Sequence, residues 1–179
     1  MKLLTRSLVV LALSVVLLGV ASLPVMAQST LSEQQRQLIR ANCLTIKNSL
    51  NQLKATDALL RVNRGQVYEA MSGRLMDRFN SRLNSNRLDA QGLTAITQSY
   101  DTRLNTFRRD YEDYARQLDA AIRIDCESDP DAFHFAIDNA RTKRQQLHED
   151  VKMLHAHIAD YRAGVIDFQT NFERVAGEE

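Results

Sequence analysis

The hydrophobic residues between residues 93 and 122 recur at the spacing of a coiled-coil seam. They are Leu93, Ile96, Tyr100, Leu104, Phe107, Tyr111, Tyr114, Leu118 and Ala121/Ile122. From Leu104 onward the members lie alternately three and four residues apart, and no proline interrupts the run. Most positions between them are polar or charged, and a narrow apolar stripe on such a helix cannot be buried alone. The pattern therefore predicts a long helix that packs against partner helices before and after it.

A second seam comes earlier and predicts a helix over residues 31–83. Its apolar members are Ile39, Cys43, Ile46, Leu50, Leu53, Leu60, Val67 and Met71, followed at steps of four by Leu75, Phe79 and Leu83. The four–three spacing holds if Asp57 and Arg64 occupy two seam positions, and the later steps of four form a stutter. A break at residues 55–57, with Asp57 as the N-cap of a new helix, is the alternative. The unchanged phase across Asp57 favours a continuous helix that starts at a Thr30/Glu33 capping box.

A third seam predicts a helix over residues 130–174. Its members are Leu147, Val151, Leu154, Ile158, Tyr161, Val165, Phe168 and Phe172, and the same phase extended backward reaches Arg144. Asp129-Pro130 marks its start, because proline suits the first position of a helix. Turns at residues 84–86 and 125–129 separate the three helices. These features predict an all-α fold, an elongated antiparallel three-helix bundle with coiled-coil-like packing, with helices near 31–83, 88–124 and 130–174 in one domain, 28–179.

The first 27 residues have the pattern of an export signal. Lys2 and Arg6 precede an uncharged apolar run over residues 8–23, and Val25-Met26-Ala27 is a small-residue cleavage site. The uncharged run is also long enough to span a bilayer at about 20 residues, so an uncleaved membrane anchor is the alternative. In both cases residues 28–179 are exported, to the periplasm, the cell surface or the medium.

The formal net charge of +1 conceals an uneven distribution. Residues 28–90 carry ten Lys/Arg and five Asp/Glu, whereas residues 91–179 carry eleven and seventeen. This asymmetry favours docking of a basic first helix on acidic later ones. A nucleic-acid partner is not expected, because it would need an exposed basic patch interleaved with aromatic residues.

The chain has two cysteines, Cys43 and Cys126, and an exported protein with two cysteines is expected to pair them. In an antiparallel hairpin that turns between Asn84 and Ser85, residues whose numbers add to about 169 lie level, and the two cysteines meet this condition. Two free thiols are the alternative. A redox-active pair is not expected without a C-x-x-C motif.

Asp57, Arg64 and Arg144 are polar residues at seam positions, and we predict that they are buried and fix the register of the helices. The same level counting brings Asp57 near Arg144 across the bundle, and Arg64 near Asn105 and Glu149. A binding site at a bend over residues 63–65 is the alternative interpretation of Arg64.

Motifs of catalysis and metal binding are not found in the sequence. There is no Gly-rich phosphate loop, no G-x-S-x-G and no H-E-x-x-H. His148 and His155 lie two turns apart, about 10 Å, which is too far to share a metal. A thin bundle is also expected to lack a pocket of catalytic size. The sequence therefore predicts a protein that is not an enzyme, without metal or cofactor.

Two family resemblances bear on function. Residues 31–35, Leu-Ser-Glu-Gln-Gln, resemble the L-T-x-x-Q motif of Spy-type periplasmic helical chaperones, with Ser32 in place of Thr. A longer part, from about residue 31 to residue 161, resembles an uncharacterised family of exported helical proteins from Saccharibacteria-type small-genome bacteria. Residues 58–66, 124–126 and 140–146 carry this second resemblance. It implies no activity, and it disfavours a chaperone for outer-membrane proteins, because such cells lack that membrane.

These observations predict an exported, non-enzymatic structural or protein-interaction bundle at the cell envelope or surface. A Spy/Skp-like extracytoplasmic holdase chaperone is the alternative, and it would need a concave exposed apolar surface. The expected partner is a protein, which includes a second copy of the chain. Membrane contact is expected only through residues 1–27 if they are not cleaved.

Overall fold

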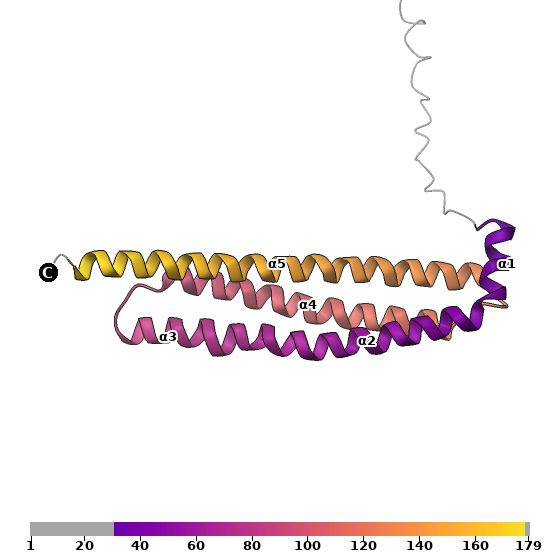
Figure 1. Ribbon diagram of the computed structural model, residues 1–179, viewed down its shortest axis with the longest axis horizontal. Helices are drawn as coiled ribbons and strands as arrows, with labels where there is room; N and C mark the ends of the chain where they lie inside the picture. The colour runs from indigo at the N-terminus through magenta and orange to yellow at the C-terminus, as the bar shows by residue number, and fades with distance from the viewer. Residues whose placement is uncertain (1–30, 178–179) are drawn as a thin grey trace, which may run out of the picture. The chain divides into compact units, whose positions relative to one another are not determined.

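The computed structural model describes residues 31–177, and every regular element in this range is a helix (Figure 1). In chain order the elements are α1 (Glu33–Ala41), α2 (Cys43–Ala70), the π-helical segment η1 (Met71–Met76), α3 (Asp77–Ser85), α4 (Gln91–Arg123) and α5 (Pro130–Ala176). The predicted all-α class is confirmed. The predicted export signal, residues 1–27, lies outside the described residues, as does Thr30.

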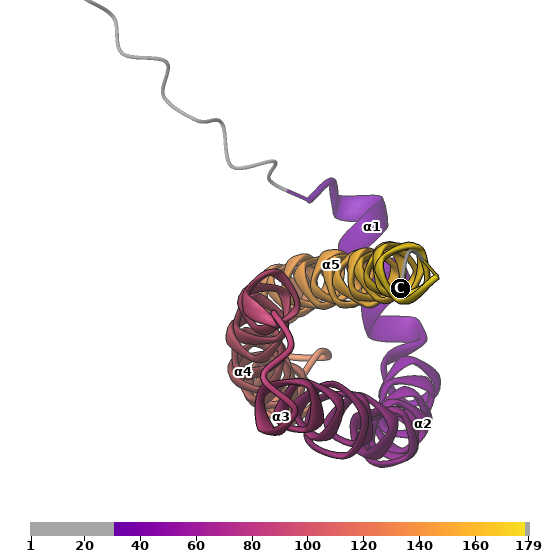
Figure 2. The ribbon, with the colours of Figure 1, turned by 90° about the vertical axis from the view of Figure 1, so that its left-hand side faces the viewer.

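Helix α4 is the element on which α2, η1, α3 and α5 pack. Viewed along the helices, α5 lies on one side of α4 and α2 with α3 on another (Figure 2). The buried residues of α4 are Leu93, Thr97, Tyr100, Leu104, Phe107, Tyr114, Leu118 and Ala121. They follow the predicted seam except that Thr97 replaces Ile96 and that Tyr111 is only partly buried.

Helix α5 packs along α4 through residues that recur every seven positions. Phe133, Ala140, Leu147, Leu154 and Tyr161 are all buried. This strict heptad keeps one stripe of α5 against α4 over most of its length. Each fully buried Leu or Phe contributes about 1.5–3 kcal/mol of hydrophobic stabilisation, so this stripe contributes to the stability of the described chain over most of the length of α5.

The first predicted helix, 31–83, is divided in the structure. The chain leaves α1 at Asn42, which has φ −110° and ψ 11° and donates from its side chain to the Leu38 carbonyl at 2.8 Å. α1 buries no residue of its own. Its start is a capping box formed by Ser32 and Gln35, not by the predicted Thr30 and Glu33.

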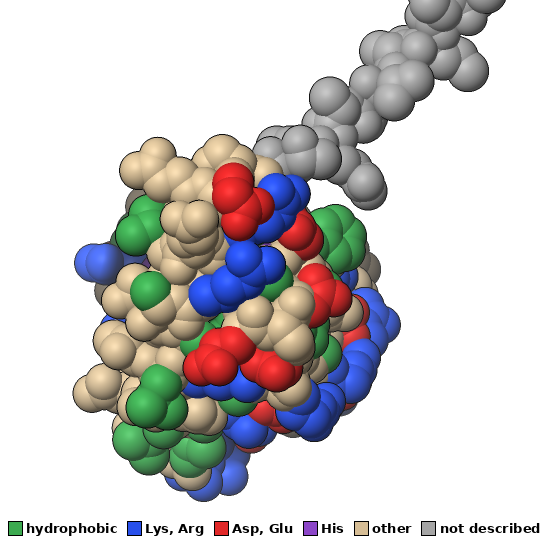
Figure 3. Space-filling model, turned by 90° about the vertical axis from the view of Figure 1, so that its right-hand side faces the viewer, with side chains coloured by type: hydrophobic (Ala, Val, Ile, Leu, Met, Phe, Trp, Pro, Cys, Tyr) green, Lys and Arg blue, Asp and Glu red, His purple; other side chains and the backbone are tan. Residues whose placement is uncertain are grey.

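An ion pair and a hydrogen bond hold α1 beside the start of α5. Arg36 Nε donates to an Asp131 carboxylate oxygen at 2.8 Å, and Arg40 Nε donates to the Glu127 carbonyl at 3.2 Å. Figure 3 shows this end of the molecule, where acidic and basic side chains are intermixed on the surface. Exposed pairs of this kind contribute at most about 1 kcal/mol each, so α1 is attached weakly compared with α4 and α5.

The π-helical segment η1 lies where the sequence predicted a stutter. Tyr68, Ser72, Met76 and Asn80 are buried at successive steps of four. Steps of four exceed the 3.6 residues of an α-helical turn, and the wider π turn keeps these residues on one face. The face itself is displaced by one residue from the prediction, because Tyr68 and Met76 are buried instead of Val67 and Leu75.

The turn after α3 is a Schellman motif. The Leu88 amide donates to the Leu83 carbonyl at 2.9 Å, the Arg87 amide donates to the Asn84 carbonyl at 3.0 Å, and Arg87 has φ 57°. At the next turn, Asp129 caps α5 by accepting from the Ala132 amide at 3.0 Å, and proline follows Asp129. The second turn lies at the predicted residues 125–129, whereas the first follows Ser85, later than the predicted 84–86, because α3 still includes Asn84 and Ser85.

Candidate binding groove

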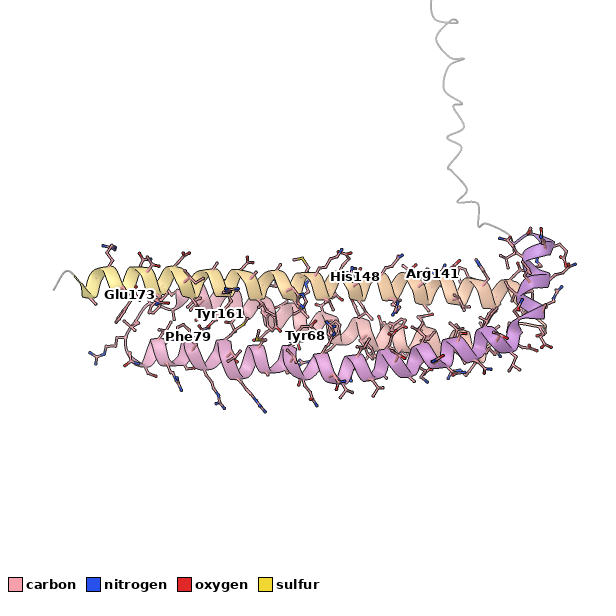
Figure 4. The ribbon with its side chains drawn as sticks, viewed as in Figure 1. Tyr68, Phe79, Arg141, His148, Tyr161 and Glu173 are labelled. Carbon is pink, nitrogen blue, oxygen red and sulfur yellow. A yellow bond between two sulfur atoms is a disulfide. The ribbon has the colours of Figure 1, made fainter. Side chains whose placement is uncertain are left out.

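An open groove of about 1000 Å³ runs between α2 and α5, with α4 as its floor. Three helices line it. The lining residues are Asp57, Leu60, Arg61, Arg64 and Tyr68 of α2, Phe107, Tyr111 and Tyr114 of α4, and all residues from 141 to 151 of α5 except Lys143 and Asp150. Figure 4 shows Arg141 and His148 on α5, and Tyr68 in the space between α5 and α2. The expectation that a thin bundle lacks a sizeable pocket is therefore wrong, since ligand sites span about 300–1000 Å³.

The groove is open because the face of α2 that lies against α4 is not the face that the apolar spacing predicted. Arg61 contacts α4, and its guanidinium lies 5.0 Å from the centre of the Tyr111 ring. Leu60 is 46% exposed and Val67 is 57% exposed. The predicted seam is therefore uncovered at Leu60, Arg64 and Val67, and the first two of these line the groove.

Asp57 lies at the centre of a polar contact that joins α2, α4 and α5. Arg144 donates from Nε and Nη2 to the two Asp57 oxygens at 3.0 and 3.1 Å, and the Tyr114 hydroxyl donates to Asp57 at 2.6 Å. The structure thus brings Asp57 and Arg144 together. α2 continues without interruption through Asp57, which excludes the helix break considered from the sequence.

The two partners of Asp57 both keep their protons. The hydrogen bond to Asp57 raises the pKa of the Arg144 guanidinium. Burial, and then the hydrogen bond to Asp57, raise the pKa of the Tyr114 hydroxyl. Asp57 therefore accepts hydrogen bonds from two groups that stay protonated, an arrangement suited to positioning the three helices.

Two of the three residues predicted to be buried are exposed. Only Asp57 is buried, at 9% exposed, whereas the Arg144 side chain is 52% exposed. The long arginine side chain reaches Asp57 from the rim of the groove and leaves much of its surface in water. The prediction of a buried Arg144 is wrong for this reason.

Arg64 is exposed as well, and it has no hydrogen bond or ion pair with any residue in the range 31–177. Its predicted neighbours have other partners: Asn105 accepts from Arg108, and Glu149 pairs with Lys152 at 2.8 Å. The chain has no bend at residues 63–65, because α2 is continuous there. Arg64 instead places an unpaired cation on the rim of the groove.

A second polar contact, outside the groove, joins α3, α4 and α5. The Tyr161 hydroxyl donates to the Asn80 side-chain oxygen at 2.8 Å, and the Asn80 amide donates to the Thr97 hydroxyl at 2.9 Å. Burial, followed by the charge of Asp77, raises the pKa of Tyr161 to about 12. The burial of Asn80 and Thr97 could not be predicted from the sequence, because each lies next to an apolar residue, Phe79 or Ile96, that fits the seam spacing.

Asp150 is a buried carboxyl that the sequence analysis also missed. Arg103 Nη1 lies 3.3 Å from one of its oxygens, and the other oxygen has no hydrogen-bond partner among the described residues. Burial, and then the neighbouring Asp110 carboxyl, raise the pKa of Asp150. Gln146 and Arg103 act in the opposite direction. The ionised form of Asp150 is therefore incompletely compensated.

We expect Asp150→Asn to leave the free energy of unfolding unchanged, or to raise it by about 1–2 kcal/mol at about pH 7, because it removes an uncompensated charge. The native pKa lies above the ordinary 3.8, so the native state holds this proton more tightly than the unfolded state. Stability from this group is therefore present at low pH and is lost as the pH rises through the native pKa. In urea unfolding at several pH values, the free energy of unfolding of the wild type should rise relative to that of Asp150→Asn as the pH falls. A difference between the two proteins that does not change with pH would contradict the raised pKa of Asp150.

Cys43 and Cys126 lie at disulfide distance, with their Cα atoms 5.6 Å apart. Both are buried beside Phe133, in a cluster separate from the main core. The pair joins the start of α2 to the turn between α4 and α5. It therefore anchors one end of α2, and with it one wall of the groove.

Within residues 31–177, no group of His, Cys, Asp or Glu side chains is arranged to hold a metal ion. None of the helices in that range combines the length and the apolar character needed to cross a bilayer. The groove thus offers aromatic and apolar surface, arginines and amides as its binding groups. No protein-family model, no curated protein and no solved structure matches the chain.

Proposed function

We propose that this is an exported, non-enzymatic helical protein that binds other proteins through the groove between α2 and α5. The observation that carries the proposal is the exposed surface of α2, where Leu60 borders a groove floored by Phe107 and Tyr111. Apolar surface with a polar rim is typical of protein interaction sites. The lining offers binding groups but no paired acid and base that would suit catalysis.

We propose further that residues 31–177 form an antiparallel three-helix bundle. In this description α1, α2, η1 and α3 form one interrupted helix, and α4 and α5 are the other two. The two turns after α3 and before α5, and the side-by-side course of α4 and α5, support it (Figure 1). Export is supported by the cysteine pair at disulfide distance, since disulfides persist in oxidising compartments. Residues 1–27 would act as the export signal or the anchor.

A holdase chaperone is the second candidate. Leu60 and Val67, two large apolar side chains of the predicted seam of α2, are 46% and 57% exposed. Such a surface, together with the concave groove, is the feature that a chaperone needs and a purely structural rod does not. Binding of many unfolded clients, in contrast to one specific partner, would distinguish this candidate.

The two candidates predict different results in an aggregation assay. A holdase at several-fold excess should suppress aggregation of a chemically unfolded, reduced client, and Leu60→Glu should weaken the suppression more than Leu59→Glu. A protein with a specific partner should leave the aggregation of such a client unchanged. Light scattering measures both outcomes. Strong suppression that neither substitution weakens would contradict the groove as the site of binding.

A further inference from the structure

We infer that the groove takes an amphipathic helix with acidic flanks, which lies between α2 and α5 as a fourth helix of the bundle. The inference rests on the proposed protein-binding function and specifies the class of partner. Three observations carry it. The lining is entirely helical, its length and apolar residues suit a helix, and the charge on its rim is positive.

The backbone of the groove favours a helical partner. Every lining residue belongs to α2, α4 or α5, so its backbone amide and carbonyl are used inside its own helix. An extended segment would find no sheet edge to pair with and would leave its own backbone groups unsatisfied on an apolar floor. A helix satisfies its backbone internally, and only its side chains need to be complementary.

The length and the apolar residues of the groove also suit a helix. Along α2 the lining runs from Asp57 to Tyr68, and at 1.5 Å per residue this stretch is about 17 Å long, or three helical turns. Leu60 on one wall, Leu147 and Val151 on the other, and the aromatic floor offer the partner contacts on three sides. A helix with apolar residues at positions i, i+3, i+4 and i+7 presents a matching stripe.

The rim of the groove is positively charged. Arg61 and Arg64 on the α2 wall form no ion pair with any residue of the range 31–177. Two carboxylates line the groove, and both have cationic partners already: Asp57 is bound by Arg144, and Glu149 pairs with Lys152. The charge still available is therefore cationic, and it favours Asp and Glu beside the apolar stripe of the partner.

The same charge disfavours a second copy docking through its own α2. That helix carries four Lys/Arg and two Asp/Glu over Cys43–Ala70, so its exposed apolar stripe comes with further positive charge. Placing it in the groove would bring like charges together along the rim, which costs affinity and suppresses the pairing. A partner of opposite charge has no such cost.

Fluorescence anisotropy with three labelled peptides tests the inference on the purified, disulfide-bonded chain. All three peptides carry the same leucine stripe over about four helical turns. One is flanked by Glu, one by Lys, and the third has the Glu flanks and a central proline that breaks the helix. We expect the Glu peptide to bind at least ten-fold more tightly than the other two, and added salt to weaken its binding.

Paired variants locate the peptide. Leu60 lines the groove whereas its neighbour Leu59, 67% exposed, does not, so Leu60→Glu is matched by Leu59→Glu. Arg64→Glu is matched by Arg74→Glu, which changes the net charge equally away from the lining. The two groove variants should lose ten-fold or more of the affinity for the Glu peptide, and the two controls should stay within about two-fold.

The other outcomes overturn the inference in distinguishable ways. Equal binding of the Glu and Lys peptides would exclude charge recognition, and equal binding of the proline peptide would exclude a helical ligand. If Leu60→Glu weakened that unselective binding, the proposed function would stand without the inference. No binding of any peptide, with a concentration-dependent dimer in sedimentation that Leu60→Glu dissociates, would assign the groove to a second copy.

Discussion

Removal of the Cys43–Cys126 pair should lower the free energy of unfolding by about 4–5 kcal/mol on the chain-entropy account of disulfides. The two cysteines are 83 residues apart, so the bond closes a long loop that the reduced unfolded chain does not have. They also bury their side chains beside Phe133, where alanine would leave a small void. Urea unfolding of the Cys43→Ala/Cys126→Ala variant against the oxidised wild type measures the difference.

Two controls separate the covalent bond from the packing. Wild type with both thiols reduced keeps the sulfur atoms and loses only the bond, so it should account for most of the destabilisation. Intact-mass analysis of the oxidised protein should find it two hydrogens lighter than the reduced form. The disulfide would be contradicted if reduction did not change the urea midpoint of unfolding. It would also be contradicted if protein isolated without reductant had two thiols that can be alkylated.

The second large effect is expected at the contact between Asp57 and Arg144. Asp57→Ala should cost about 3 kcal/mol, the lower end of the range for breaking a buried ion pair, because it also strands the buried Tyr114 hydroxyl. Arg144→Leu should cost roughly 1–3 kcal/mol, because it leaves the buried Asp57 carboxylate with Tyr114 alone. The expected cost of Arg144→Leu is smaller because the Arg144 side chain is exposed, so water can take over part of its hydrogen bonding to Asp57.

The double variant isolates the interaction between the two side chains. If they act on each other as the geometry indicates, Asp57→Ala/Arg144→Leu should be less destabilised than the sum of the single changes, by about 1–3 kcal/mol. Equilibrium unfolding of the four proteins completes the cycle. Arg141→Leu is a suitable control, since Arg141 pairs with Asp138 and not with Asp57. Additive single effects would show that the contact contributes nothing to stability.

The course of α4 and α5 could be predicted from the sequence because their apolar residues face a partner helix over most of their length. Where α4 carries Tyr100, Leu104 and Phe107 at steps of four and three, only one face of the helix can be buried. The level counting that placed Cys43 beside Cys126 relied on the same regularity. The course of the two helices and the pairing of the cysteines both follow from the spacing of residues along the chain, which can be read directly from the sequence.

The course of α2 could not be predicted in the same way, because α2 has two overlapping stripes. Both contain Asp57; one continues with Leu60, Arg64 and Val67, and the other with Arg61 and Tyr68. Apolar periodicity selects the first, but the second faces α4 through a hydrogen bond from Tyr114 to Asp57 and the stacking of Arg61 on Tyr111. These contacts depend on residues far away in the chain, so spacing alone cannot identify them.

Asp150 was missed for a related reason. A charged residue beside Val151 in a helical pattern is normally assigned to the solvent side of the helix. Its burial depends on Arg103, which lies 47 residues earlier and on a different helix. Buried polar residues with distant partners are therefore the part of the core that a single sequence reveals least.

The most direct test of the groove as the proposed protein-binding site is site-specific photo-crosslinking in cells that produce the protein. A photoreactive residue in place of Leu60 lies on the groove, and one in place of Leu59 lies on the exposed surface outside the lining. Mass spectrometry then identifies the crosslinked segments. The account predicts defined products from position 60, joined to segments with a helical apolar stripe, and few from position 59. Equal yields from both positions, or products from position 59 alone, would contradict it.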